Sequence, residues 1–258
     1  MTEPFALTPL IVAGIAAVGF FNAAYNVAVG PTGGAMVAGF SSLLPPALAL
    51  MLQAIGNIIG GFTRTVTFIR RIERRPFIII MAGMVAGFAL AMPVFRYVPE
   101  YVLQLALGAL IIVMVWWPVR KSDGRTQDAG LFFATVGGSA LSVFFATGMM
   151  IVGSYYARYF PERERYLAHA NVWSLIQNVI KIIWFSTWLV VDAQTIIMLA
   201  GVVFASMMAG HYAGLKIAGR VPEKYLRAAL KITITVFAII LLYKGGQHLL
   251  LTGLAAGR

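Results

Sequence analysis

Residues 7–29 contain no charged side chain, and apolar stretches of this kind recur along almost the whole chain. As an α-helix this first stretch spans about 34 Å, enough to cross the hydrocarbon core of a bilayer. A chain of 258 residues, 60% hydrophobic and only 11% charged, has too little polar surface to cover a water-soluble core. The sequence therefore predicts an all-α integral membrane protein with about eight transmembrane helices.

Two further segments are interrupted before they reach that length. Gly30-Pro31 and Gly33-Gly34 follow the first helix, and Pro45-Pro46 breaks the chain again after too few residues for a crossing. A similar short segment lies between Thr147-Gly148 and Phe160-Pro161. We expect both to be broken or re-entrant helices, set among longer helices at 7–29, 46–62, 77–95, 101–117, 129–147, 167–191, 195–217 and 225–242.

The two halves of the chain repeat the same order of segments. Three short motifs recur in that order: Val98-Pro99-Glu100 as Val221-Pro222-Glu223, Ala82-Gly83 as Ala200-Gly201, and Gly56-Asn57-Ile58-Ile59 as Gln177-Asn178-Val179-Ile180. We therefore divide the chain into a first membrane repeat at 1–118, a cytoplasmic linker at 119–129 and a second membrane repeat at 130–258.

The net charge of +11 is interpreted as a signal of topology rather than of nucleic-acid binding. If the basic loop 64–75 is cytoplasmic, the basic segments 120–125, 163–165 and 216–224 fall on the same side, and Arg96 and Asp192 on the other. This arrangement inverts one half relative to the other, an architecture typical of transporters. The N-terminus is then outside if each broken segment returns to its own side, and inside if it crosses.

The first half contains, in order, the break Gly-Pro-Thr-Gly-Gly-Ala-Met at 30–36, the Pro45-Pro46 pair, a polar-striped helix, a basic loop and the Val-Pro-Glu motif, and the second half repeats this pattern. The duplicated pattern resembles the TauE/SafE family over residues 10–242. The resemblance implies a secondary transporter of small anions, most often sulfite or organosulfonates, in a bacterial-type inner membrane, and no enzymatic activity. The first break has fewer glycines than the family pattern, and the second, Thr147-Gly148-Met149-Met150, has one. The chain is therefore identified as a divergent member.

No carboxylate is predicted at membrane depth, because all nine acidic residues fall in predicted loops or tails. This argues against a cation site and against acid–base catalysis within the membrane. The chain has no cysteine, and its three histidines lie far apart in the sequence. We therefore expect neither a metal site nor a cofactor.

Lys181 lies near the centre of the predicted helix 167–191. A charge there costs about 3 kcal/mol, so such a residue is a functional candidate. With no acid nearby in the membrane, an anionic substrate is a suitable counter-ion. The alternative is that Lys181 extends to an interface, or lines the bundle without contacting substrate.

Polar residues spaced three or four apart form a stripe on one face of each of two corresponding helices: Asn171, Ser174, Asn178 and Lys181, and Gln53, Asn57, Gly60 and Arg64. The repeat aligns Asn57 with Asn178. Two amides that face the centre are suitable hydrogen-bond donors to an oxyanion. The alternative is that the amides only hold helices together.

The helix breaks offer backbone N–H groups at a positive dipole end, which favours anions. In the first break Gly33 and Gly34 allow close approach and Thr32 adds a hydroxyl; in the second, Gly148 and Thr147 play these parts. Close helix packing by small residues is the alternative.

Three further residues are candidates for gating or coupling. His211 is a candidate for a proton-coupled transport cycle, because histidine is the usual pH switch among side chains, although a packed histidine is the commoner case. Arg158, next to Tyr159, is either a cytoplasmic gate or an interfacial anchor. Arg64 ends the stripe of the first half.

The expected partners are a small anion and the lipid bilayer, with no nucleic acid; a homo-oligomer remains open. Two other functions were weighed: an enzyme or binding protein for lipid or polyprenyl phosphate, and a non-catalytic membrane subunit. The exact anion, the direction of transport and the coupling ion are open at this point.

Overall fold

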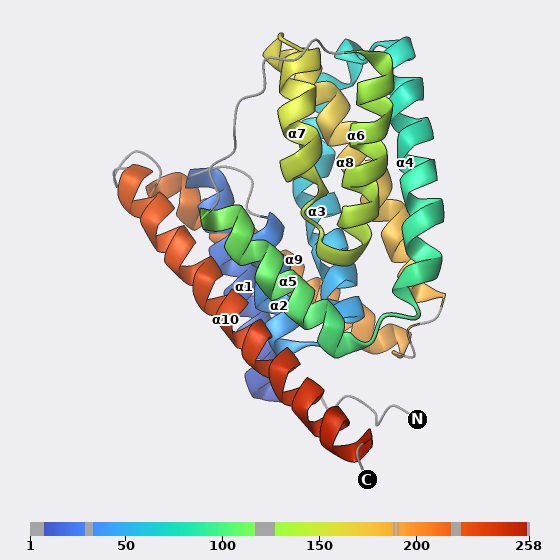
Figure 1. Ribbon diagram of the computed structural model, residues 1–258. Coiled ribbons are helices and arrows are strands. Elements are labelled where there is room, and N and C mark those ends of the chain that lie inside the picture. Colours follow the sequence, from blue (N-terminus) through green and yellow to red (C-terminus); the bar gives the residue numbers. More distant parts are fainter. Residues whose placement is uncertain are drawn as a thin grey trace.

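The computed structural model describes residues 8–28, 33–116, 127–187, 189, 191–217 and 223–256, which form helices and no strand (Figure 1). The elements are α1 (Pro9–Ala28), α2 (Gly33–Leu43), α3 (Pro46–Phe68), the 3-10 helix η1 (Ile69–Arg71), α4 (Arg74–Phe95), α5 (Glu100–Trp116), α6 (Asp128–Phe145), α7 (Gly148–Tyr159), α8 (Arg163–Ser186), α9 (Ala193–Ile217) and α10 (Glu223–Ala256).

The helix interruptions at Pro45-Pro46 and Thr147-Gly148 are present, whereas Gly30-Pro31 lie outside the described residues. α3 begins at Pro46, a position where the missing N–H of proline costs no hydrogen bond. α6 ends at Phe145 and is followed by Ala146, whose φ of 52° is left-handed, and α7 begins two residues after Ala146. α2 has 11 residues and α7 has 12, so neither is long enough to cross a bilayer by itself. The short helices are therefore confirmed.

Three predicted helix ends are wrong. α3 continues from the predicted end at 62 to Phe68, and α8 ends at Ser186 instead of 191. The largest difference is in α10, which continues from 242 to Ala256. Gly245 and Gly246 do not end it, and at Gly245 the missing side chain lets α10 approach the Tyr101 carbonyl of α5 closely.

Five helices are long and apolar enough to cross a membrane among the residues described: those within Pro9–Val27, Arg74–Phe95, Asp128–Phe145, Ala193–Lys216 and Lys231–Leu249. The full count of about eight stays a prediction. α3 and α8, with 23 and 24 residues, are also long enough, but polar residues interrupt them. These are the two helices with the predicted polar stripes.

The helices form two groups. Figure 1 shows α4, α6, α7 and α8 together on one side and α1, α2, α5 and α10 on the other, with the C-terminal part of α10 extending beyond the rest. α3 packs against α8 and also against α2 and α9, so it joins the two groups. The predicted linker at 119–129 falls mostly outside the described residues.

The main helix pairs have defined directions. α1 and α9 run parallel, as do α4 and α6, because contacts advance together along both chains: Gly19 with Ser206, Gly214 with Ala24, Gly83 with Phe132 and Gly87 with Val136. α5 and α10 run antiparallel: Trp116 Nε1 donates a 3.3 Å bond to Thr235, whereas Tyr101 lies beside Gly245. α3 and α8 also run antiparallel, because the chain just after α3 meets the start of α8, where the Glu73 N–H donates to His169.

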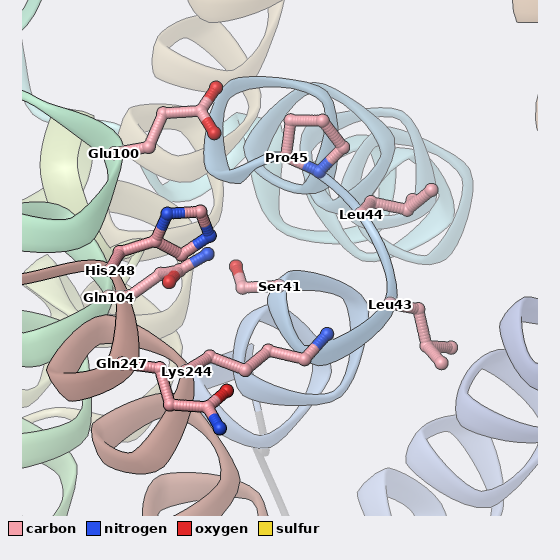
Figure 2. Close-up of a pocket in the computed structure, with 9 residues that line it drawn as sticks. All are labelled: Ser41, Leu43, Leu44, Pro45, Glu100, Gln104, Lys244, Gln247 and His248. Carbon is pink, nitrogen blue, oxygen red and sulfur yellow. The ribbon is translucent and has the colours of Figure 1, made fainter. Parts of the chain in front are cut away.

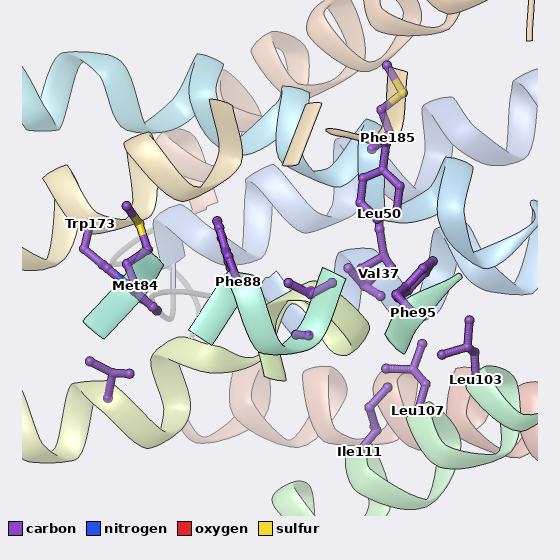
Figure 3. Close-up of a cluster of buried hydrophobic side chains, with 14 of the residues drawn as sticks. Val37, Leu50, Met84, Phe88, Phe95, Leu103, Leu107, Ile111, Trp173 and Phe185 are labelled. Atoms are coloured by element: carbon purple, nitrogen blue, oxygen red, sulfur yellow. The ribbon is translucent and has the colours of Figure 1, made fainter. Parts of the chain in front are cut away.

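The largest apolar cluster lies between the two groups and includes side chains from α2, α3, α4, α5 and α8 (Figure 3). Phe95 is central, with its ring centroid 5.4 Å from that of Phe185 and 5.6 Å from that of Trp184. A separate apolar cluster joins α1, α2, α3 and α9. Side chains of α2 and α3 belong to both clusters, so these two helices connect the clusters.

Ion pairs bring three of the predicted cytoplasmic segments together at one end of the molecule. Arg71 pairs with Glu164 at 2.9 Å, Arg75 with Asp128 at 2.6 Å and Arg165 with Glu73 at 2.6 Å. The start of α6 and the end of α7 also meet there, because Tyr155 Oη bonds the backbone of Gln127. The start of α6 and the end of α7 therefore lie at the same end of the molecule, which agrees with the alternative in which the second broken segment returns to its own side.

Close helix approach at glycine gives a stability prediction. A methyl group added at Gly210 would overlap the Phe20 carbonyl oxygen of α1, whereas one at Gly201, on the same helix, would meet nothing within 4 Å. We expect Gly210→Ala to destabilise the protein by about 1–3 kcal/mol and Gly201→Ala to leave stability unchanged or slightly higher. Thermal unfolding of the purified variants measures this. Equal melting temperatures would show that α1 and α9 do not pack as described.

Candidate functional site

The polar residues of α3 and α8 are buried at the centre of the molecule. Gln53 is 0% exposed, and Asn178 and Lys181 are each 1% exposed. Because α3 and α8 run antiparallel from a shared end, Gln53 lies at about the level of Lys181, and Asn57 at about the level of Asn178. The two helices that carry the predicted stripes thus pack against each other, with Asn57 and Ser174 half-buried.

Lys181 lies against the C-terminal end of α6. Its Nζ donates a 3.5 Å bond to the carbonyl of Ser142, which also accepts the Ala146 N–H at 3.1 Å. The C-terminal end of a helix carries partial negative charge, so it stabilises an ammonium group. This contact is long for a hydrogen bond to a charged donor. The ammonium therefore has capacity for a stronger partner.

The carboxylates that the structure describes do not neutralise Lys181. All four ion pairs among the described residues lie at the cluster of helix ends that joins η1 and the starts of α4, α6 and α8. Their side chains are at least one-third exposed, whereas Lys181 is almost fully enclosed. The charge at the centre is thus positive and is balanced only by a helix dipole.

Several buried polar side-chain atoms on α3, on α8 and at the α6–α7 junction have no hydrogen-bond partner among the described residues. They are both amide atoms of Gln53, Oδ1 of Asn178, Nδ2 of Asn171 and Oγ1 of Thr147. Each such atom costs about 1–3 kcal/mol unless water or a ligand pairs with it. Asn178 is partly satisfied, since its Nδ2 donates to the Ser174 carbonyl at 2.7 Å. The stripe therefore has unused donors and acceptors next to a buried cation.

The second break contributes Thr147 to this region. Thr147 is 3% exposed, immediately follows the left-handed Ala146 and precedes α7. At Gly148 an added side chain would overlap the Gly138 carbonyl of α6, so the glycine is required for close packing there. Close helix packing thus explains why residue 148 is a glycine, and anion binding by its backbone N–H stays a prediction.

Other predicted site residues are only partly described. Thr32 lies outside the described residues, and Gly33 and Gly34 are the first two residues of α2. Arg64 lies in the last part of α3, but the position of its side chain is not described. For these residues binding of an anion, or gating, remains a prediction.

His211 and Arg158 lie away from the central stripe. His211 is exposed on α9, which packs on α1. Arg158 is exposed near the end of α7, where its Nε bonds the Ser154 carbonyl and its guanidinium lies 5.4 Å from the centroid of the Tyr155 ring. This position, at the same end as the ion pairs, agrees with either a gate or an interfacial anchor.

A second row of buried residues on α8 was not predicted. His169, Trp173, Gln177 and Lys181 follow one another at intervals of four, and the last three contact α6, whereas His169 meets Glu73 and Phe160. Trp173 Nε1 donates to Ser139 Oγ at 3.1 Å, and Ser142 Oγ donates to Gln177 Oε1 at 2.6 Å. The four-residue interval was present in the sequence, but the matching Ser139 and Ser142 on α6 were not considered.

No group of three histidine, cysteine, aspartate or glutamate side chains suitable for a metal ion occurs within the described part of the chain. A buried ammonium, two buried amides and a buried hydroxyl lie on α8, on α3 and at the α6–α7 junction. These groups donate hydrogen bonds and positive charge, which are what a small oxyanion requires.

Comparison with known proteins gives one match. A family model described as "Sulfite exporter TauE/SafE" matches residues 15–241. No curated protein and no solved structure gives a significant match. The matched range contains all of α2 to α9, and therefore the whole Lys181 region.

Burial of Lys181 predicts a gain in stability when its charge is removed. Methionine is unbranched and apolar, so Lys181→Met keeps most of the volume and avoids desolvation of a charge. We expect the unliganded protein to become more stable by about 1–3 kcal/mol, measured by thermal unfolding in detergent. Lys231→Met, at an exposed position on α10, is the control; it removes only a contact with the Trp116 ring and should change stability by less than about 1 kcal/mol. A lower melting temperature for Lys181→Met would assign Lys181 a structural role.

Proposed function

This chain belongs to the sulfite exporter TauE/SafE family, and from that membership we propose that it is a secondary transporter of sulfite or small organosulfonates. The family assignment and the long apolar helices make it a multi-pass membrane protein of a transporter family. The proposal adds the substrate class, the central binding site, the inner membrane as its location and a non-enzymatic function.

The observation that carries the proposal is the buried ammonium of Lys181 without a carboxylate partner. An isolated buried charge is unfavourable unless a second charge joins it. A sulfite or sulfonate supplies that charge together with oxygen atoms that accept hydrogen bonds. The amide nitrogens of Gln53, Asn57 and Asn178 and the hydroxyls of Ser174 and Thr147 are the donors that we assign to those oxygens. The unpaired oxygens of Gln53 and Asn178 are acceptors, which require a donor such as an ammonium group or water.

Alternating access requires two halves that move around a fixed site, and the helix directions support this. In a two-fold repeat, α1 corresponds to α6 and α4 corresponds to α9. The parallel packing of α1 on α9 therefore corresponds to the parallel packing of α6 on α4. The corresponding helices α3 and α8 are antiparallel, as are α5 and α10. This is the pattern that two inverted repeats at 1–118 and 130–258 would produce. We propose that Gln53 and Lys181 lie near the axis that relates them.

Anion flux tests the role of Lys181. Proteoliposomes that contain the purified protein are loaded with sulfite, and efflux is measured for wild type, Lys181→Met and Asn178→Leu. Because a hydrogen bond to a charged group contributes about 1.5–3 kcal/mol, we expect at least a tenfold loss for Lys181→Met and a smaller loss for Asn178→Leu.

Lys216→Met is the matched control for this assay, since Lys216 lies over the ring of Tyr212 at the end of α9, away from the stripe. Sulfate and acetate are tested alongside sulfite to define selectivity. Unchanged sulfite efflux in Lys181→Met would remove this residue from the transport pathway, and absence of flux of any anion in wild type would refute the transporter proposal.

The proposed orientation can be measured by labelling, because the natural chain has no cysteine. Tyr97 is 85% exposed between α4 and α5, and Arg70 is exposed in η1 at the opposite end of α4. With the basic end in the cytoplasm, Tyr97→Cys reacts with a membrane-impermeant maleimide in intact cells, whereas Arg70→Cys reacts only after lysis. The reverse result would invert the proposed topology.

A further inference from the structure

A cavity of about 320 Å³ opens at the end of the molecule opposite the ion pairs (Figure 2). Its wall includes the α2–α3 junction at 43–45, the start of α5 and the C-terminal part of α10. The polar lining residues are Ser41, Glu100, Gln104, Lys244, Gln247 and His248. The α10 part of this lining follows residue 241, where the family match ends. None of the lining residues belongs to the polar stripes of α3 and α8, so the cavity is separate from the Lys181 stripe.

Lys244 brings a positive charge to this cavity. Its Nζ donates a 2.7 Å bond to the Ser42 carbonyl at the C-terminal end of α2, where the helix dipole favours a cation. An ammonium group has three donors, and this contact uses one of them. Lys244 therefore keeps donors and charge for an anionic group in the cavity.

Two buried polar side chains in the wall have atoms without a partner. Ser41 is 1% exposed and its Oγ makes no hydrogen bond, while Gln104 is 9% exposed and its Oε1 accepts none. Unpaired groups of this kind are rare in stable structures and indicate a missing water or ligand. The oxygen of Gln104 requires a donor, which a simple anion does not supply.

Glu100 gives the cavity a negative side. It is the first residue of α5, and Figure 2 shows it across the opening from Lys244, with Ser41 and Gln104 between them. No ion pair joins Glu100 to Lys244 in the described part of the chain. The two charges thus remain available to opposite ends of one ligand.

We propose that this cavity binds a small zwitterion, with its anionic group on Lys244 and its ammonium group on Glu100 and Gln104 Oε1. Such a ligand satisfies both charges and the unpaired oxygen together. A simple anion would pair with Lys244 alone and lie beside the Glu100 carboxylate. A bound zwitterion would also connect the α2–α3 junction to α5 and α10. This inference is independent of the anion site at Lys181.

Three probes of similar size separate the charges of such a ligand. β-Alanine carries both charges, propionate only the negative one and n-propylammonium only the positive one. Melting temperatures of the full chain in detergent are measured at millimolar concentrations of each, at constant ionic strength, with glycine and γ-aminobutyrate to vary the distance between charges. We expect at least one zwitterion to raise the melting temperature, with an apparent affinity at least tenfold higher than that of either singly charged probe.

Two variants and one control complete the test. Lys244→Met should abolish the shift by zwitterions, and Glu100→Gln, at an exposed position, should make propionate as effective as β-alanine. Lys231→Met on the same helix, outside the cavity, should behave as wild type. The proposal is overturned if no zwitterion shifts the wild type, if propionate equals β-alanine in the wild type, or if the shift persists in Lys244→Met. Sulfite efflux through wild type and Lys181→Met is unaffected by any of these results, so the two proposals fail separately.

Discussion

The central constraint on this molecule is a lysine ammonium buried in an apolar bundle with a helix end as its main counter-charge. Lys181 is held at the end of α6, where the Ser142 carbonyl accepts from it at 3.5 Å. That contact requires α6 to stop in the interior, which the left-handed turn at Ala146 provides. It also requires α8 to lie close to α6, which Trp173 and Gln177 secure through Ser139 and Ser142. The broken helix and the charged site are thus parts of one arrangement.

Small residues make this arrangement possible in a membrane. The parallel pairs α1–α9 and α4–α6 approach so closely that glycines face backbone carbonyls of the partner helix, as at Gly83 and Gly210. Close backbone approach replaces the hydrophobic driving force that lipid does not provide between helices. Besides these two pairs, α3 and α8 pack against each other and carry buried polar residues in their middle turns. Polar residues are tolerated there because protein, not lipid, surrounds them.

The sequence predicted what depends on local spacing and hydropathy. The short helices followed from Pro45-Pro46 and Thr147-Gly148, and the burial of Lys181 from its place in an apolar segment. It did not predict contacts that depend on how two helices are rotated against each other, such as Ser142 with Gln177. Lys244 was missed for a different reason. The prediction ended the last helix at 242, before Gly245 and Gly246, whereas packing on α5 stabilises the helix through both glycines.

Lys181 and Lys244 each place a positive charge at the C-terminal end of an interrupted helix. Each donates to a carbonyl near the end of an interrupted helix, α6 for Lys181 and α2 for Lys244. Interrupted helices expose carbonyls that attract cations, and in transporters such ends coordinate ions. In this chain the cation is a lysine side chain, so the helix end is neutralised while the other N–H donors of the ammonium remain available. The difference between the sites then lies in their surroundings. Around Lys181 the unpaired groups are amides and a hydroxyl without acids, which favours an anion, whereas Glu100 beside the Lys244 cavity favours a ligand with both charges.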